Sequence, residues 1–482
     1  MNRRMVCHTV GMIILLEAVL LLPSLAVSLI YKNSCINAFL LTIGFALAFG
    51  GAMVFIARPR TKVLYAKEGF AITTLAWLFL SLIGALPFFL SGQIPNYIDA
   101  FFETASGFTT TGASILEDVT KLDKGLLFWR SFTHWVGGMG VLVFLMVFLS
   151  SLSDRSIHII RAETPGPMVG KLLPRVKDSS KTLYLIYLVM TVILVIALKI
   201  SGMDLFESLV HAFGTAGTGG FGVRADSAAS FTDAQQWIIA IGMLFFGINF
   251  NLYYLMLIRH FKSAIRSTEL WVYIGIVSAA TAICCFNLAG SFESLADLIR
   301  HSFFQVSSII TTTGFSTVDF NLWPNLSKTV LLILMFLGAC AGSTAGGFKI
   351  SRVILLFKNC FAEFRHLLHP RSVGVVRFEG KVVDGETRKG VSSYLAIYTV
   401  VFFATFFLIS FDGFHIETNF SAAAACFNNI GPGFGMVGPM SNFSGYSDFS
   451  TLVLSFAMIL GRLEIWPIIM AFAPSAWRGW RA

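Results

Sequence analysis

The stretch Thr311-Thr312-Thr313-Gly314-Phe315-Ser316 decides the fold, because close variants of it occur four times along the chain. Each copy ends a short apolar stretch of fewer residues than the roughly 20 that a helix needs to cross a bilayer. The other three copies are Thr109-Thr110-Thr111-Gly112-Ala113-Ser114, Gly217-Thr218-Gly219-Gly220-Phe221-Gly222 and Ile430-Gly431-Pro432-Gly433-Phe434-Gly435.

The four copies align on a glycine that is followed in three of them by phenylalanine, which is replaced by Ala113 in the first copy. Irregular backbone at membrane depth is tolerated only where it is buried in protein or lines a water-filled cavity. We therefore expect each short stretch to form a half-helix that enters the membrane, turns in a loop and leaves on the same side. The half-helices are predicted at 97–109, 205–217, 295–311 and 417–429, and the shared glycines are Gly112, Gly220, Gly314 and Gly433.

Long apolar segments surround these stretches and place the chain among membrane proteins. Hydrophobic residues make up 56% of the 482 residues and charged residues only 13%, whereas soluble domains carry about 25% charged residues. The mean hydropathy is +0.76. Ten transmembrane helices are predicted, at about 10–31, 36–57, 70–91, 126–150, 182–201, 236–258, 270–290, 328–357, 391–411 and 449–473.

The order of the segments predicts an all-α integral membrane protein with a fourfold internal repeat. The repeating unit is helix, pore helix, filter loop and helix, in a pseudo-fourfold arrangement, with two extra transmembrane helices in front. The predicted units are 1–67 for the two N-terminal helices, then 68–155, 178–266, 267–365 and 388–482 for repeats 1 to 4.

The basic residues follow this layout. If the N-terminus is cytoplasmic, 26 of the 35 lysines and arginines fall on the inner side, as the positive-inside rule expects. This count holds only if all four short stretches return to the outer face. The start MNRR, followed by an apolar run over 10–30, resembles a secretory signal, but the run is long enough to span, so we expect an uncleaved first helix.

The repeated loops have the composition of a cation filter. A dehydrated K⁺ needs a cage of oxygens in place of its hydration shell, and rings of backbone carbonyls can supply it. Glycine permits the unusual backbone angles that point carbonyls into one axis, and each half-helix directs its negative C-terminal dipole there. The predicted K⁺-binding residues are Thr110, Thr111, Gly112, Thr218, Gly219, Gly220, Phe221, Thr312, Thr313, Gly314, Phe315, Asn429, Ile430, Gly431, Gly433 and Phe434.

Other interpretations of these motifs are weaker. Two of the loops match GxGxxG, at 217–222 and 433–438, but neither follows a convincing β-strand, as a dinucleotide site requires. The clusters of small residues could instead let helices pack closely, although four of them in register argue for a repeated loop. His134, His211 and His301 could relay protons, but we expect structural roles because no chain of His, Asp and Glu accompanies them.

A second set of residues interrupts the eighth predicted helix. Residues 338–347 are ten small residues that include four glycines and two hydroxyl side chains, which makes a weak helix. A small-xxx-small packing motif is the alternative, but we expect an unwound loop below the filter. Arg462, inside the last span, could donate hydrogen bonds to the loop, while Glu464 faces another partner. The predicted gate is Gly338, Gly342, Ser343, Thr344, Gly346, Gly347 and Arg462.

With these residues in place, the chain resembles the TrkH/TrkG branch of the Trk/Ktr/HKT potassium transporter superfamily over essentially its whole length. The resemblance implies a homodimer with one pore per subunit and a cytosolic TrkA-like regulatory partner, which would bind ATP/ADP or NAD(H) while this chain carries no cofactor. It also implies that residues 338–347 and Arg462 gate the pore. The motifs are TASGFTTTGAS (104–114), HWVGGMG (134–140), TTTGF (311–315), AGSTAGGFKISR (341–352), NNIGPGFG (428–435) and GRLEIWP (461–467).

We therefore expect a K⁺ uptake protein of the bacterial inner membrane, multi-pass, with both termini cytoplasmic, in contact with lipid and not with nucleic acid. A K⁺/Na⁺ or K⁺/H⁺ coupled symporter is the alternative, and no acid/base or metal set suggests an enzyme. The second loop has more glycine than the family's usual form, which would loosen its cage. The basic segments 155–181 and 349–389 are candidate docking surfaces for the regulatory partner.

Overall fold

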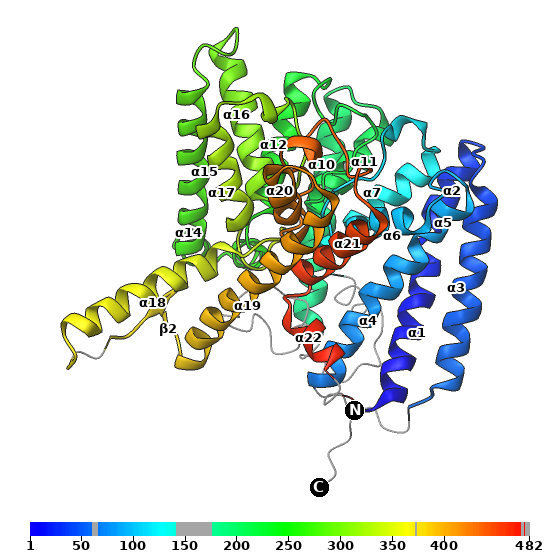
Figure 1. Ribbon diagram of the computed structural model, residues 1–482, viewed down its shortest axis with the longest axis horizontal. Coiled ribbons are helices and arrows are strands. Elements are labelled where there is room, and N and C mark those ends of the chain that lie inside the picture. The colour runs from blue at the N-terminus through cyan, green and yellow to red at the C-terminus, as the bar shows by residue number, and fades with distance from the viewer. Residues whose placement is uncertain (60–65, 141–175, 372–373, 474–476, 478–482) are drawn as a thin grey trace.

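The computed structural model describes residues 1–59, 66–140, 176–371, 374–473 and 477. The described chain is almost entirely helical, with one two-stranded antiparallel hairpin that pairs Arg377 with Val382 and Phe378 with Lys381. The fold class predicted from the sequence is thus confirmed. The N-terminal helices α1 and α3 lie at one edge of the molecule, and α15, α16 and α17 lie at the opposite edge (Figure 1).

The elements follow the predicted order along the chain. They are α1 (Arg3–Leu20), α2 (Leu22–Ile30), α3 (Ile36–Ile56), α4 (Ala66–Gly84), α5 (Leu86–Leu90), α6 (Tyr97–Phe108), η1 (Val119–Lys121), α7 (Lys124–Gly138), α10 (Val176–Ile200), α11 (Leu205–Ala216), α12 (Asp233–Phe246), α13 (Phe250–Leu257), α14 (Phe261–Ile265), α15 (Thr268–Asn287), α16 (Leu295–Ile310), η3 (Phe320–Leu322), α17 (Asn325–Leu337), α18 (Ile350–Leu368), β1 (Arg377–Phe378), β2 (Lys381–Val382), α19 (Gly385–Ile409), η4 (Ser410–Asp412), α20 (Ile416–Phe427), η5 (Gly435–Val437), α21 (Asp448–Arg462) and α22 (Trp466–Phe472).

Six of the predicted membrane spans are helices long and apolar enough to cross a membrane, within the part of the chain that the structure describes. They are Arg3–Ile30, Ile36–Ile56, Lys67–Leu90, Lys181–Ile200, Thr268–Asn287 and Gly385–Asp412. The span predicted at 126–150 is described as far as residue 140, and residues beyond it, including most of the basic segment 155–181, lie outside the described residues.

Two spans predicted as continuous helices are bent instead. α12 and α13 meet at 87°, and α21 and α22 meet at 117°. At the first bend the Asn249 side chain accepts a hydrogen bond from the Asn251 N–H and so starts a new helix. At the second bend, Glu464 and Ile465 both have positive φ, which no α-helix tolerates.

The span predicted at 328–357 is divided in two. α17 ends at Leu337, where Gly338 has a φ of +67°, and the chain remains irregular until α18 begins at Ile350. α18 then leaves the helical body together with the start of α19 and forms a projecting arm (Figure 1). The interruption of this span was predicted, but α18, which forms its second half, does not continue along the axis of α17.

The four short helices predicted from the repeat are present as α6, α11, α16 and α20. Each has a carboxylate in its first turn, where it complements the positive end of the helix dipole. Asn96, Asp204 and Ser294 cap the first three with side-chain oxygens. The first-turn carboxylates are Asp99, Glu207, Asp297 and Glu417.

Candidate ion pathway

All four short helices end in the same hydrogen-bonded turn. In the first, the N–H of Thr110 bonds to the Gly107 carbonyl at 3.1 Å and the N–H of Thr111 to the Ser106 carbonyl at 2.9 Å. This pair of bonds is the Schellman motif, which places one residue in the left-handed region. That residue is Thr110, Thr218, Thr312 and Asn429 in turn, with φ of 56°, 55°, 55° and 57°. Since a β-branched residue rarely adopts positive φ, the three threonines mark a constrained site.

Two residues further on, every loop has a glycine with positive φ. These glycines are Gly112, Gly220, Gly314 and Gly431, with φ of 80°, 78°, 88° and 103°. The fourth member is therefore Gly431, and the alignment on Gly433 was wrong. The equivalent glycine is the one at a fixed distance from the end of the short helix. In the fourth loop, Pro432 separates this glycine from the later Gly-Phe pair on which the sequences were aligned. Gly433 instead donates its N–H to the Val437 carbonyl at 2.7 Å.

The four glycines connect the loops in a closed cycle. A Cβ placed on Gly112 would overlap the Gly219 carbonyl oxygen, and one on Gly431 would lie 2.9 Å from the Thr111 carbonyl oxygen. The same relation joins Gly220 to the Thr313 carbonyl and Gly314 to the Ile430 carbonyl. Each loop thus rests its glycine on the carbonyl of the next, and the fourth rests on the first. The carbonyls of Thr111, Gly219, Thr313 and Ile430 therefore form one layer around a common axis.

Two of the four left-handed residues, Thr312 and Asn429, connect this layer to the interrupted segment 338–347. The Thr312 hydroxyl accepts a hydrogen bond from the Gly346 N–H at 2.7 Å, and a Cβ on Gly346 would lie 2.9 Å from the Asn429 Cβ. Asn429 also donates to the Thr111 hydroxyl at 2.9 Å and to the Met458 carbonyl at 2.9 Å. The segment therefore packs directly against the ends of the third and fourth loops.

The same segment occupies the break between α12 and α13. The Cys340 N–H donates to the Gly247 carbonyl at 3.1 Å, and the Phe250 N–H donates to the Gly342 carbonyl at 3.0 Å. The Thr344 hydroxyl donates to the Phe246 carbonyl at 3.2 Å. These bonds satisfy backbone groups that both broken helices leave without helical partners, so the bend in one repeat and the loop in the next stabilise each other.

Arg462 makes the predicted hydrogen bond to the loop. Its Nη1 donates to the Thr344 carbonyl at 2.8 Å. Its Nη2 donates to the Gly137 and Gly138 carbonyls at 2.7 and 2.9 Å, at the end of α7. The guanidinium therefore joins the loop, the end of α7 and the end of α21, although the α7 contact was not predicted.

Four charged residues near the loop were not predicted as part of the site. Glu269 accepts hydrogen bonds from the Ala341 and Ser351 N–H groups at 2.7 and 3.1 Å. The Lys349 ammonium donates to the Ala345 carbonyl. Arg352 pairs with Glu464 at 2.5 Å and lies 4.1 Å from the Tyr394 ring centroid. The sequence signal that could have identified them is a charged residue within or beside an apolar segment, because such a residue needs a specific partner.

A buried ion pair behind the first two filter loops was also missed. Arg130 of α7 pairs with Glu103 of α6, and Glu103 accepts hydrogen bonds from the Ile115 N–H at 2.9 Å and the Ser114 hydroxyl at 3.1 Å. The guanidinium carbon of Arg130 lies 3.4 Å from the Phe221 ring centroid. The pair therefore ties the outer end of the first loop to the second.

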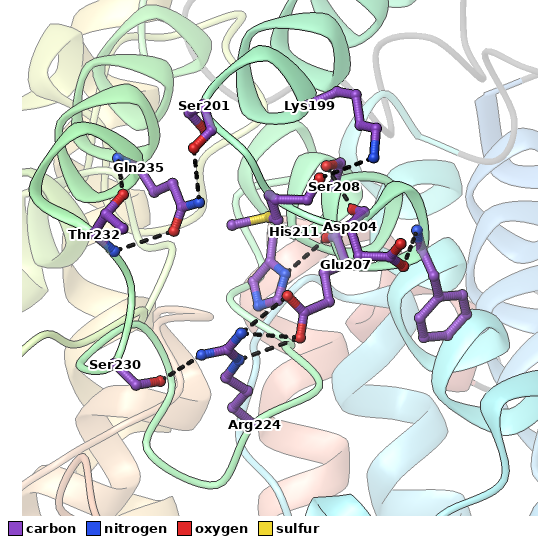
Figure 2. A network of polar contacts seen from close by, with 12 residues as sticks. Lys199, Ser201, Asp204, Glu207, Ser208, His211, Arg224, Ser230, Thr232 and Gln235 are labelled. Atoms are coloured by element: carbon purple, nitrogen blue, oxygen red, sulfur yellow. Dashed lines mark hydrogen bonds and ion pairs between the residues drawn. The ribbon is translucent and has the colours of Figure 1, made fainter.

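The second repeat has a comparable connection on its outer side. Arg224, which follows the second filter loop, pairs with Glu207 of α11 at 3.0 Å and donates to the Ser230 hydroxyl at 2.8 Å (Figure 2). His211 bonds through Nδ1 to the Glu207 carbonyl at 2.8 Å, as the same view shows. This bond gives His211 a structural partner on its own helix.

The fold and the site define a multi-pass membrane protein with four re-entrant loops around one axis. The family profile "TrkH: Cation transport protein" matches residues 35–478. The chain therefore belongs to the TrkH family of cation transport proteins, which confirms the resemblance seen in the motifs and the expectation that it is not an enzyme.

Named relatives match over nearly their whole length. The Trk system potassium uptake protein TrkH of Escherichia coli K12 is 35% identical over 487 residues, covering 99% of this chain and 100% of the relative. The Trk system potassium uptake protein TrkG of the same strain is 33% identical over 483 residues, covering 98% and 99%. The crystal structure of the potassium transporter TrkH from Vibrio parahaemolyticus superimposes with a TM-score of 0.88 at 31% identity, covering 99% and 100%.

Proposed function

We propose that this chain is the K⁺-conducting subunit of a bacterial uptake system. The observation that carries the proposal is the closed cycle of four carbonyls, each held against the glycine of the preceding loop; they are those of Thr111, Gly219, Thr313 and Ile430. Uncharged carbonyl oxygens replace the hydration shell of a cation without trapping it. Relatives that match over their full length are named potassium uptake proteins.

The segment 338–347 and Arg462 act as the gate in this proposal. The segment lies against the ends of the third and fourth filter loops, so it obstructs an ion that leaves the filter inward. Arg462 holds the segment through the Thr344 carbonyl. Opening requires these bonds to be exchanged for others, which makes the loop an element with two alternative arrangements.

The cytosolic partner belongs to the same proposal. We assign regulation to a TrkA-like subunit that binds ATP/ADP or NAD(H), with no cofactor on this chain. The arm formed by α18, the hairpin and the start of α19 supports a docking role. Its exposed basic residues are Arg365, Arg371, Arg377, Lys381 and Lys389.

The arm also supports a homodimer. Phe357, Phe361, Phe364 and Leu368 are 63%, 71%, 61% and 60% exposed, and their spacing of four, three and four residues places them on one face of α18. A projecting apolar stripe of this kind suits a self-complementary contact with a second copy across a twofold axis. The proposal further places the protein in the inner membrane with both termini cytoplasmic, because most of the basic residues then lie inside.

The test is growth of a K⁺-uptake-deficient bacterium at low external K⁺, with the regulatory partner co-expressed. Wild type should restore growth, and Gly314→Ser should abolish it because the new side chain meets the Ile430 carbonyl at a φ of +88°. Gly275→Ser is the matched control, since a Cβ on Gly275 meets nothing within 4 Å. Failure of wild type, or equal uptake of Na⁺, would overturn the proposal. Uptake that requires a Na⁺ or H⁺ gradient would favour coupled symport instead.

A further inference from the structure

The second filter loop differs from the first and third in a way that the structure explains. In those two loops, paired threonines flank the left-handed residue, and their hydroxyls lie 2.8 Å apart in both cases. This hydrogen bond joins the two residues on either side of the left-handed residue and so stiffens the turn. The pairs are Thr109 with Thr111 and Thr311 with Thr313, and the corresponding residues of the second loop are Gly217 and Gly219.

His134 of α7 occupies the space that the second loop leaves empty. A Cβ on Gly219 would overlap the imidazole ring of His134. A Cβ on Gly217 would overlap the His134 carbonyl oxygen and would lie 3.1 Å from the His134 Cβ. The two glycines are therefore required by a neighbour from the first repeat. Gly219 does not have positive φ, so its backbone alone would accept a threonine.

The imidazole is held firmly in this place. His134 is fully buried, and its Nδ1 lies 2.7 Å from the Gly107 carbonyl, which can only accept, so Nδ1 carries the proton. The ring centroid lies 4.1 Å from that of Phe221 in the same filter loop. The Arg130 guanidinium covers Phe221 in turn. One histidine thus contacts the short helix of the first repeat and the filter loop of the second.

We propose that His134 is the positioning residue of the second filter loop, which takes the part that the paired threonines take in the first and third. Glycine loses more backbone freedom on ordering than any other residue, so two glycines without support would leave the Gly219 carbonyl poorly fixed in its layer. The ring of His134 restores the constraint and thereby sets K⁺ over Na⁺ discrimination at this side of the filter. This inference rests on the proposed function.

The test is a double-mutant cycle between the two positions. Wild type, His134→Ala, Gly219→Thr and the double variant are purified and reconstituted in proteoliposomes. K⁺ and Na⁺ fluxes and the midpoint of thermal unfolding are measured for each. His134→Ala should lower the K⁺/Na⁺ flux ratio by about threefold or more. A change of that size corresponds to the lower end of the coupling energies found between residues in contact. Gly219→Thr should lose K⁺ flux and unfold at a lower temperature.

The double variant decides the matter. Removal of the imidazole makes room for the threonine that the first and third loops carry, so the double variant should unfold at a higher temperature than Gly219→Thr and regain K⁺ flux. His301→Ala is the matched control. That histidine bonds to Thr317 at 2.8 Å, and its loss should not rescue Gly219→Thr.

Two results would overturn the inference: additive effects in the double variant, or an unchanged flux ratio in His134→Ala. A wild type that fails to select K⁺ would instead refute the proposed function. The unfolding midpoints still report the coupling between His134 and Gly219 in that case, so the two failures are distinguishable.

Discussion

Single residues set the geometry of the proposed filter through backbone angles that few side chains accept. Thr110, Thr218 and Thr312 adopt left-handed φ, which costs on the order of 1–3 kcal/mol for such a residue. The surrounding turns overdetermine these angles, because both Schellman hydrogen bonds form at each helix end. The backbone strain is therefore located at the residue directly before each carbonyl of the layer.

The register of the fourth loop gives a prediction at this scale. Gly431→Ala should abolish K⁺-selective growth, because φ is +103° and the new Cβ meets the Thr111 carbonyl oxygen at 2.9 Å. Gly433→Ala should have a smaller effect, because Gly433 does not have positive φ and its new Cβ would meet Ser421 and Val437, at 2.9 to 3.1 Å, and none of the four carbonyls of the layer. Complementation at low K⁺ compares the two. Equal loss in both variants would contradict the register based on Gly431.

The buried pair of Arg130 and Glu103 gives a second prediction. Arg130→Met should lower the free energy of unfolding by about 3–5 kcal/mol, since it leaves a buried carboxylate without its cation. Adding Glu103→Gln should recover part of the loss, because the uncompensated charge is removed. Thermal unfolding in detergent measures both variants. A double variant less stable than the single one would show that the charge is not the cause.

The sequence analysis named most of the loop residues that adopt positive φ, and the reasons for the exceptions are physical. Thr110, Gly112 and Gly314 were found because left-handed angles and close approach restrict composition strongly. The fourth loop was aligned on Gly433 because that glycine precedes a phenylalanine, as in the second and third loops. The equivalent glycine is Gly431, because its place is set by its distance from the end of the preceding helix. The part played by His134 was not found because it depends on a contact between two repeats that no local pattern records.

At the scale of elements, the broken helices matter more than the continuous ones. The loop between α17 and α18 lies in the break between α12 and α13, and backbone hydrogen bonds from each satisfy the other. The apolar pattern predicted the loop, because its composition is extreme. The apolar pattern did not predict the bends at Asn249 and Glu464, because hydropathy indicates which residues are buried and not the direction in which a helix runs.

The proposed gate, formed by residues 338–347 and Arg462, gives the prediction at this scale. Arg462→Ala should raise basal K⁺ flux in proteoliposomes that lack the regulatory partner, because the loop loses its bond through the Thr344 carbonyl. Arg462→Lys keeps the charge but cannot reproduce the planar fork that reaches Thr344, Gly137 and Gly138 together. It should fall between wild type and the alanine variant. Basal flux that is unchanged in both variants would remove Arg462 from the gate.

At the scale of the whole molecule, the projecting arm carries the contact of the proposed homodimer. Its exposed phenylalanines lie on a helix that leaves the body (Figure 1), and apolar residues on one face of such a helix need a cover. The amphipathic pattern of 350–368 is readable from the sequence. The direction in which α18 leaves is not, because it follows from φ values at Gly347 and Lys349 of 73° and 77°.

This arm gives the last prediction. Phe361→Glu combined with Phe364→Glu should convert the proposed homodimer to a monomer, because burying two unpaired charges costs several kcal/mol each. Mass measurement of the detergent-solubilised protein reads the outcome. Phe286→Glu is the control, as Phe286 is 84% exposed on α15, away from the arm. A dimer that persists in the arm variant would place the contact elsewhere.

The closed cycle of four loops has a consequence for how such a pore can change over time. In a channel assembled from four identical chains, one codon alters every side of the ring at once. Here each side is encoded separately, so a substitution alters a quarter of the ring and leaves three quarters as they were. The second loop, with glycines where its neighbours have threonines and a histidine borrowed from the first repeat, is an example of such stepwise divergence.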